Sequence, residues 1–235
     1  MQEHQIIIAK RFCGPPQSGN GGYVAGLLAK AIARPCQVTL HAPPPLDTPL
    51  RLLPVAEGLQ LLDGDLLLAT AKDYQLQMAA PQPPALASAL SAERRYEGFQ
   101  DHGLPNCFVC GPLRKASDGL RIFAGPLDAG ADQVAAVWQP DATLDDGTGM
   151  VASEFVWAAL DCPGFFAIKH ASGTALLGRF AACLLEPVAI GERLIVSAWA
   201  LGHDGRKHQA GTALHRQDGT PVALAEATWI SLNKA

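Results

Sequence analysis

NGGYVAGLLA (residues 20–29) aligns with ASEFVWAALD (residues 152–161) at an offset of 132 positions, and each stretch has the pattern of a helix start followed by an apolar helix. Each stretch keeps a feature that the other lacks. The first begins on two glycines but has Ala29 where the second has Asp161, and the second has no glycine at its start. If the two helices face each other, the Gly-Gly start of one and the acid of the other complete a single site.

The similarity continues beyond the two helices. At an offset of 144 positions, Pro43, Leu46, Leu50, Leu52 and Gly58 fall on Pro187, Ile190, Leu194, Val196 and Gly202. Asp63-Gly64 falls on Asp218-Gly219 at an offset of 155, so the first copy is 11 residues shorter in this region. Internal repetition of this kind predicts two similar structural units in one chain.

Length and composition are those of a soluble chain with one large or two modest cores. The 235 residues are 49% hydrophobic and 17% charged, and the formal net charge of −4 argues against a general nucleic-acid or anionic-membrane surface. No apolar run approaches the roughly 20 residues of a spanning helix, and the three-isoleucine run near the start is too short for a secretory core. We therefore expect a cytoplasmic protein with no nucleic-acid or membrane partner.

Turn signals and periodicity divide the chain into an N-terminal unit (1–78), a linker (79–105) that could carry a short helix, and a C-terminal unit (106–235). The N-terminal unit is expected to have a helix at about 21–33 and strands at 5–12, 36–41, 50–56 and 66–76, the last two around the hairpin signal Asp63-Gly64. The C-terminal unit is expected to have a helix at about 151–162 and strands at 120–123, 134–138, 176–184, 193–201, 209–216 and 222–231. A helix followed by antiparallel strands, occurring twice, predicts an α+β fold with a curved sheet around each helix.

Six cysteines lie at positions 13, 36, 107, 110, 162 and 183. Only Cys107 and Cys110 have metal-ligand or redox spacing, and a structural zinc site would need a second pair, or histidines, nearby in the sequence. The favoured interpretation is that reduced cysteines pack as small apolar side chains in a cytosolic protein. We therefore expect no metal and no cofactor, with a zinc knuckle as the alternative.

Several motifs resemble those of a known fold. NCFVCGP (106–112), DGLRIF (118–123), the acid near the end of the second helix and the strand start around Gly191-Glu192 are similar to the hot-dog fold, and most of all to the PaaI-like acyl-CoA thioesterases. Those proteins often carry Cys-Phe-x-Cys-Gly, a His-Gly-Gly helix start and an acid nine positions after that histidine. The resemblance covers residues 106–231 well and 5–77 more loosely. It implies a double hot-dog, that is, a fused pseudo-dimer, and a homo-oligomer of such pseudo-dimers.

The resemblance also implies where the site lies. Hot-dog thioesterases build each site across a dimer interface, with a helix-start amide from one partner and an acid from the other. Asn20, Gly21 and Gly22 match the helix start, with Asn20 in place of histidine, and Asp161 matches the acid. The expected site is therefore composite, with the Gly21 amide facing Asp161, and the opposite pair, Ser153 and Ala29, should be inactive.

Elementary chemistry is compatible with such a site. Backbone N–H groups at a helix start stabilise the negative charge that develops on a thioester carbonyl, and glycine lets a ligand approach them. Asp161 could act as a base toward water or as a nucleophile, and a thiol with a pKa of about 8.5 can leave as thiolate. Because an apolar helix precedes Asp161 and Pro163-Gly164 follows it, we expect Asp161 in a last helical turn within apolar surroundings. The alternative is an exposed aspartate at a fraying helix end.

Three further residues are weaker candidates. Glu154 lies seven residues before Asp161, about 10.5 Å along the helix and nearly on the same face, where it could orient water or substrate. Glutamate in a first helical turn is also favoured by the helix dipole alone. Tyr23 and Trp157 could line an acyl pocket, although aromatic residues on a central helix more often belong to the core.

The sequence leads to three functional hypotheses. The first is an acyl-CoA thioesterase, acting on acyl-CoA or another acyl thioester. The second is a protein that binds acyl-CoA or another apolar ligand without catalysis, because the second helix lacks the His-Gly-Gly start. The third is a hot-dog hydratase or dehydratase, which generally needs an acid and a histidine together; neither predicted central helix contains a histidine. The acyl chain and the thiol carrier stay open.

Overall fold

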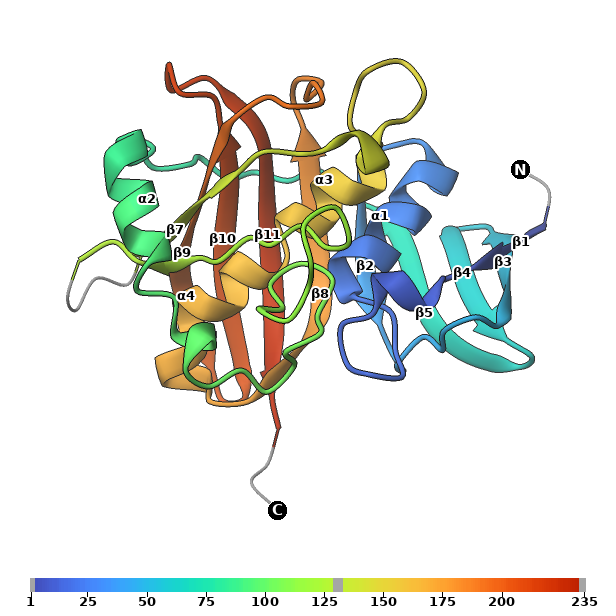
Figure 1. Ribbon diagram of the computed structural model, residues 1–235. Coiled ribbons are helices and arrows are strands. Elements are labelled where there is room, and N and C mark those ends of the chain that lie inside the picture. Colours follow the sequence, from blue (N-terminus) through green and yellow to red (C-terminus); the bar gives the residue numbers. More distant parts are fainter. Residues whose placement is uncertain (1–2, 129–132, 233–235) are drawn as a thin grey trace.

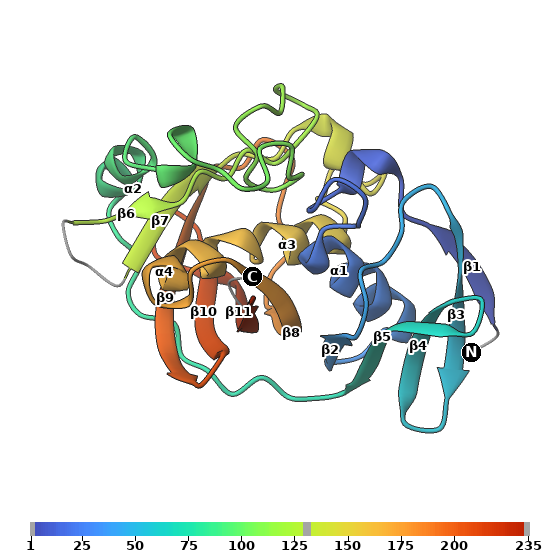
Figure 2. The same cartoon turned by 90° about the horizontal axis from the view of Figure 1, so that it is seen from below.

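A single antiparallel sheet organises the chain. The computed structural model describes residues 3–128 and 133–232. Its sheet has the strand order β1-β3-β4-β5-β2-β8-β11-β10-β9-β7-β6 (Figure 1). The sheet curves, and the helices α1, α3 and α4 lie on its concave side (Figure 2). Of the helices in the described part of the chain, none is long and apolar enough to cross a membrane.

The N-terminal half of the sheet packs against α1. It contains β1 (His4–Ile7), β2 (Cys36–Leu40), β3 (Pro49–Val55), β4 (Gly58–Asp63) and β5 (Leu66–Asp73), with a 3-10 turn η1 (Lys10–Phe12) before α1 (Gly21–Ile32). Alternate residues of β3 and β4 point inward, so that Leu50, Leu52, Leu59 and Leu61 are buried. The buried face of α1, which includes Val24, Ala25 and Leu28, packs against them in one core.

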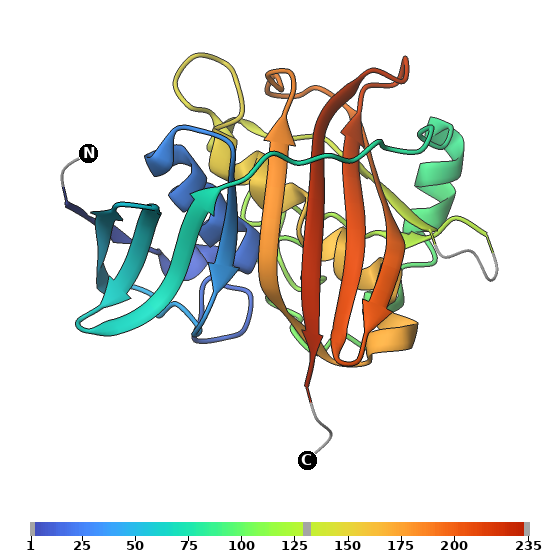
Figure 3. The ribbon, with the colours of Figure 1, turned by 180° about the vertical axis from the view of Figure 1, so that it is seen from behind.

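The C-terminal half of the sheet packs against α3 and α4. Its elements are α2 (Leu86–Glu93), η2 (Glu97–Phe99), β6 (Gly125–Pro126), β7 (Gln133–Trp138), η3 (Ala142–Leu144), α3 (Ser153–Ala159), α4 (Cys162–Ser172), β8 (Ala175–Leu184), β9 (Leu194–Asp204), β10 (Lys207–His215) and β11 (Pro221–Ser231). The segment between β5 and α2 crosses the outer face of the sheet (Figure 3). The helix expected between residues 79 and 105 is present as α2, which lies beside β6 and β7 at the outer edge of this half.

Three sequence predictions about these elements were wrong. The first strand ends at Ile7 instead of continuing to Phe12. The turn at Asp63-Gly64 joins β5 to β4, which was not anticipated, and β3 pairs with the other side of β4. Residues 120–123 form no strand, because Leu120 and Ile122 donate their N–H groups to the carbonyls of Phe108 and Val109 instead of to a sheet neighbour.

The two halves of the sheet repeat one strand order. Outward from the junction, the first half runs β2-β5-β4-β3-β1 and the second runs β8-β11-β10-β9-β7, with β6 added at the edge. In each half the strand that follows the central helix lies at the junction. The junction itself is the pair β2–β8, in which Gln37, Val38 and Thr39 oppose Ala181, Phe180 and Arg179.

The helices α1 and α3 pack against each other without a spacer. A Cβ atom on Gly26 would lie 2.6 Å from Cα of Glu154, and one on Gly22 would lie 3.0 Å from the carbonyl oxygen of Trp157. The contacts advance along α1 as they retreat along α3, so the helices are antiparallel. The start of α1 is therefore beside the end of α3, and the start of α3 is beside the end of α1.

Candidate active site

Asn20 joins the start of α1 to Asp161. It is the N-cap residue of α1, and its side-chain Oδ1 accepts a hydrogen bond of 2.9 Å from the backbone N–H of Tyr23. Asparagine is among the preferred N-cap residues because it satisfies an otherwise unpaired helical N–H group. Its Nδ2 donates to Oδ2 of Asp161 at 2.8 Å. Since the two partners require an acceptor and a donor respectively, the orientation of the buried amide is fixed.

Gly22 supplies the second hydrogen bond to the same carboxylate oxygen. Its backbone N–H lies 2.9 Å from Oδ2 of Asp161. A Cβ atom on Gly22 would be only 2.5 Å from Cβ of Asp161, so any side chain at this position would push the carboxylate away. The contact therefore depends on glycine, and it lies at the positive end of the α1 dipole, where a carboxylate is stabilised.

Asp161 is a buried residue at the junction of two helices. It follows α3 and directly precedes α4, whose first turn contains Pro163. Proline is tolerated in a first helical turn because no intrahelical N–H bond is required there, so Pro163-Gly164 opens a new helix. The expectation that this dipeptide ends the helical segment was wrong. The alternative of an exposed, fraying aspartate is also wrong, because Asp161 is 2% exposed.

The surroundings of Asp161 favour proton exchange near neutral pH. Burial raises the pKa of Asp161 to about 7; the N–H of Gly22 opposes that rise, and the Cys107 sulfur adds to it. The second carboxylate oxygen, Oδ1, has no hydrogen-bond partner among the described residues. Oδ1 is thus the atom at which water or a substrate could be engaged.

The predicted site residues come together with one change of role. The expected partner of Asp161 was the amide of Gly21, but the contact is made by Gly22. A Cβ atom on Gly21 would lie 2.8 Å from Leu177 and 3.1 Å from Leu40, so Gly21 packs against β8 and β2 at the junction of the two halves. A contribution of Gly21 to catalysis stays a prediction.

The opposite end of the α1–α3 pair has different chemistry. Nζ of Lys30, in the last turn of α1, lies 3.0 Å from Oε1 and 3.1 Å from Oε2 of Glu154, in the first turn of α3. The Glu154 side chain is 11% exposed and that of Lys30 is 56% exposed. An ion pair therefore occupies the place where the repeat would put a second site, and Glu154 is directed away from Asp161, toward Lys30.

Tyr23 and Trp157 are packed within the core. Tyr23 is 6% exposed and stacks on Phe12 with ring centroids 4.2 Å apart. Trp157 is 4% exposed and meets the ring of Phe180 edge-on at 5.6 Å. A role in lining an acyl pocket stays a prediction for both residues, because in this structure other side chains fill the space around their rings.

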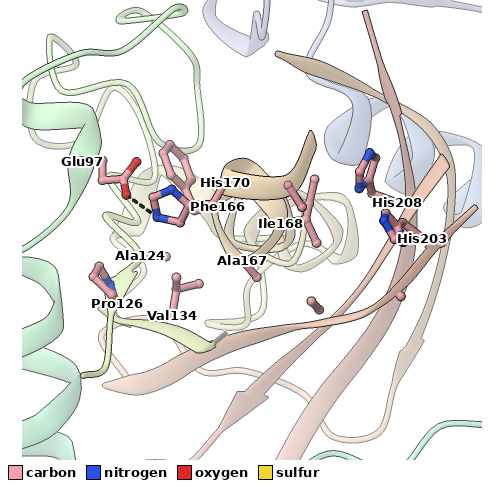
Figure 4. Close-up of a pocket in the computed structure, with 13 residues that line it drawn as sticks. Glu97, Ala124, Pro126, Val134, Phe166, Ala167, Ile168, His170, His203 and His208 are labelled. Carbon is pink, nitrogen blue, oxygen red and sulfur yellow. Dashed lines mark ion pairs between the residues drawn. The ribbon is translucent and has the colours of Figure 1, made fainter. Parts of the chain in front are cut away.

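A cavity of about 270 Å³ lies beside α4, away from Asp161. Phe166, Val134 and Ile168 contribute to its apolar wall (Figure 4). His203 and His208 lie at one end, and Glu97 at the other end pairs with His170 at 2.9 Å. His170 is the histidine of α4, and its exposed side chain pairs with the carboxylate of Glu97. Neither Asp161 nor Gly22 lines this cavity, and Asp161 is 2% exposed, so the carboxylate is closed off in this structure.

Sequence analysis missed a group of sulfur atoms beside Asp161. The Sγ atoms of Cys107, Cys110 and Cys162 all lie within 4.8 Å of one another, and all three residues are buried. Asn20 Nδ2 is 3.9 Å from the sulfurs of both Cys107 and Cys162. Cys162 is remote from the Cys-x-x-Cys motif in sequence, and its position directly after Asp161 was the available signal.

Comparisons with known proteins identify the architecture. No family model matches the sequence, and no curated protein matches it. Among solved structures, the chain is similar to the tesB protein of Mycobacterium avium subsp. paratuberculosis (13% identity, 97% of this chain and 92% of the other, TM-score 0.64). It is also similar to a putative thioesterase II of Thermobifida fusca (13% identity, 98% of this chain and 92% of the other, TM-score 0.64).

A third structural neighbour is described by its fold. It is a conserved protein of unknown function with a hot dog fold from Alicyclobacillus acidocaldarius, matched at 14% identity over 99% of this chain and 94% of the other with a TM-score of 0.64. At such identities the likeness concerns the fold. With the antiparallel sheet curved around its helices, it shows that the chain has the α+β hot-dog fold that the motifs predicted.

Proposed function

We propose that this protein hydrolyses an acyl thioester, with acyl-CoA as the expected substrate, at one composite site. The observation that carries the proposal is the contact of Asp161 with Asn20 and Gly22. A buried carboxylate is held at a helix start by two donors on one oxygen, while its other oxygen has no partner in the described part of the chain. A purely structural carboxylate in such a setting would normally have both oxygens satisfied.

We further propose that the chain is a double hot-dog, a fused pseudo-dimer of the PaaI-like kind. The repeated strand order supports this, as does the similarity of thioesterase-named structures over nearly the whole chain. The units would be residues 1–78 and 106–235, with 79–105 as the linker. In this arrangement α1 contributes Asn20 and Gly22 and the other unit contributes Asp161, so neither unit alone holds a complete site.

Two chemical routes fit this geometry. In the first, Asp161 takes a proton from water, the resulting hydroxide adds to the carbonyl carbon, the C–S bond breaks and the thiol leaves as thiolate. In the second, a carboxylate oxygen attacks the carbonyl, forms a mixed anhydride and expels the thiolate, and water then hydrolyses the anhydride. Because the single N–H of Gly22 already donates to Asp161, we propose that the second Nδ2–H of Asn20 and the backbone N–H of Gly21 polarise the thioester carbonyl in both routes.

The burial of Asp161 is also compatible with a second function, ligand binding without catalysis. Because Asp161 and Asn20 are 2% and 3% exposed, a substrate can reach the carboxylate only after the site opens. A protein that binds acyl-CoA or another apolar ligand without turnover would not need that opening. A hydratase is less favoured, because the α4 histidine is paired with Glu97 at the surface.

Thiol release from a panel of short, medium, long and aryl acyl-CoAs tests the proposal. The wild type should turn over at least one class, and Asp161→Asn should lower kcat about 100-fold or more, because an amide can neither accept the proton nor attack. Asp204→Asn, at the exposed end of β9, is the matched control and should keep wild-type rates. Saturable binding without thiol release would favour the binding protein, and full activity of Asp161→Asn would exclude this site.

A further inference from the structure

The three buried thiols next to the candidate active site form a group with its own chemistry. They come from two distant parts of the chain, the 107–110 loop and the first residue of α4. We propose that Cys107, Cys110 and Cys162 bind one zinc ion as thiolates. This site is separate from the proposed thioester hydrolysis and stands whether or not the protein is an enzyme.

The spacing of the sulfur atoms fits a tetrahedral metal. With Zn–S bonds of about 2.3 Å, two sulfurs of a tetrahedral site lie about 3.8 Å apart. The Cys107 and Cys162 sulfurs are 3.6 Å apart, and all three pairwise distances are within 4.8 Å. Ion binding therefore needs only small side-chain adjustments.

The loop that carries two of the ligands is held in place by backbone contacts. The N–H of Gly111 donates to the carbonyl of Cys107 at 2.9 Å, and a Cβ atom on Gly111 would lie 2.6 Å from the backbone nitrogen and oxygen of Cys107. The N–H of Phe108 donates to the carbonyl of Cys13 at 2.7 Å. The conformation that brings Cys107 and Cys110 together is thus fixed independently of any metal, which lowers the cost of ordering the ligands.

Polar contacts orient the Cys107 sulfur. Its Sγ lies 3.6 Å from Sγ of Cys162, and Nδ2 of Asn20 donates to it at 3.9 Å. Thiolates are the form in which cysteine binds metals. Amide N–H donation to a ligand sulfur is the kind of outer contact that orients and stabilises ligands.

The choice of metal follows from the ligands. Three thiolates select a borderline or soft ion, and zinc prefers tetrahedral sulfur coordination over the octahedral oxygen ligands of magnesium or calcium. Binding releases the three thiol protons, and the three sulfurs leave one tetrahedral position for water or an added thiol. The Asn20 amide lies 3.9 Å from two of the sulfurs and holds Asp161, so the ion would lie just behind the candidate carboxylate.

Metal analysis of the reduced full-length protein tests the proposal. The protein is stripped with a chelator under reductant, reloaded with Zn²⁺ or Co²⁺ and desalted, and its metal content is measured by mass spectrometry. About one equivalent per chain is expected. The Co²⁺ form should show thiolate-to-metal charge transfer in the near ultraviolet and the visible bands of a tetrahedral ion.

Variants identify the ligands. Cys107→Ser and Cys162→Ser should each lose the bound metal and the charge-transfer band, whereas Cys183→Ser, at a half-buried thiol of β8, should keep both. Circular dichroism checks that each variant is folded. The wild-type measurement is decisive even where a variant does not fold, because reduced wild-type protein that retains no Zn²⁺ or Co²⁺ after reloading overturns the proposal. The proposal is also overturned if Cys107→Ser and Cys162→Ser both retain the metal. It is overturned as well if the wild type forms a Cys107–Cys162 disulfide instead of taking up metal.

Discussion

The backbone N–H of Gly22 lies 2.9 Å from Oδ2 of Asp161, and this hydrogen bond joins residues 139 positions apart. It connects the first turn of α1 to the junction of α3 and α4. The length of this hydrogen bond therefore depends on how the N-terminal and C-terminal halves of the chain pack against each other. The contact has no room for adjustment, since a Cβ atom on Gly22 would collide with the aspartate.

Gly22→Ala should reduce activity far more than stability. The added Cβ would lie 2.5 Å from Cβ of Asp161 and displace the carboxylate, and a displacement of about 1 Å can cost about 100-fold in rate. Overpacking costs about 1–3 kcal/mol, and the better helix propensity of alanine offsets up to about 1 kcal/mol of that. Thiol release and urea unfolding measure the two effects. Gly103→Ala, with no atom within 4 Å of the new Cβ, is the control; equal kcat in both variants would mean that the Gly22 contact is not used.

Two substitutions of Asn20 separate its two roles. Asn20→Ser keeps an N-cap oxygen for Tyr23 but removes the donor to Asp161, whereas Asn20→Ala removes both. We expect a large loss of kcat in both variants, with an additional loss of about 1 kcal/mol in the free energy of unfolding only for Asn20→Ala. Urea midpoints together with kcat and KM show the pattern. Full turnover by Asn20→Ser would indicate that Asn20 acts only as a cap.

Lys30→Met should affect stability without affecting turnover. The substitution keeps the length of the side chain but leaves the Glu154 carboxylate, which is 11% exposed, without its cation. Because Lys30 itself is 56% exposed, solvent screening limits the expected loss to about 1 kcal/mol in the free energy of unfolding. Chemical denaturation gives the free energy of unfolding and thiol release gives kcat, both measured on one preparation. A large drop in kcat would show that the Lys30–Glu154 end of the helix pair takes part in the reaction after all.

Protonation of His215 should make the protein acid-sensitive. Burial lowers the pKa of His215 below its value of about 6.5 in an unfolded chain, and its Nδ1 has no partner in the described segments. The unfolded state therefore takes up the proton first as the pH falls, so this contribution to stability is complete above about pH 6.5 and is lost below it. Urea midpoints at pH 7.5 and 5.0 should differ more for the wild type than for His215→Gln. If the urea midpoint falls by the same amount between pH 7.5 and 5.0 in the wild type and in His215→Gln, the acid sensitivity comes from other groups.

Hydrophobic periodicity predicted α1, α3 and five strands of the longer unit, but it did not predict α4 and it placed a strand at 120–123 where the structure has none. The offset of 144 aligns Leu50 and Leu52 with Leu194 and Val196, and the four residues occupy β3 and β9, which hold corresponding positions in the two halves and are buried there. The helix-start pattern at Asn20 and the acid at Asp161 led to side chains that are in contact, because both patterns depend on local chemistry that is visible in one sequence.

Features that depend on non-local backbone contacts were not predictable. Gly58 begins β4 with φ of 143°, and a Cβ atom there would lie 1.9 Å from the carbonyl oxygen of Ala71; from the sequence, Glu57-Gly58 resembles a loop. The DGLRIF segment has the alternation of a strand, yet its N–H groups bond to the loop of Cys107 and Cys110. The position of Cys162 beside that loop follows from the packing of α4, which no local pattern encodes.

The junction between the halves has a mechanical consequence. Only three residue pairs join β2 to β8, whereas nine join β10 to β11. Gly21 packs on both junction strands, and the next residue, Gly22, holds Asp161. Bending at this narrow seam would change the distance between α1 and Asp161, so we expect substitutions that strengthen the pairing of β2 with β8 to hold Gly22 and Asp161 together more firmly.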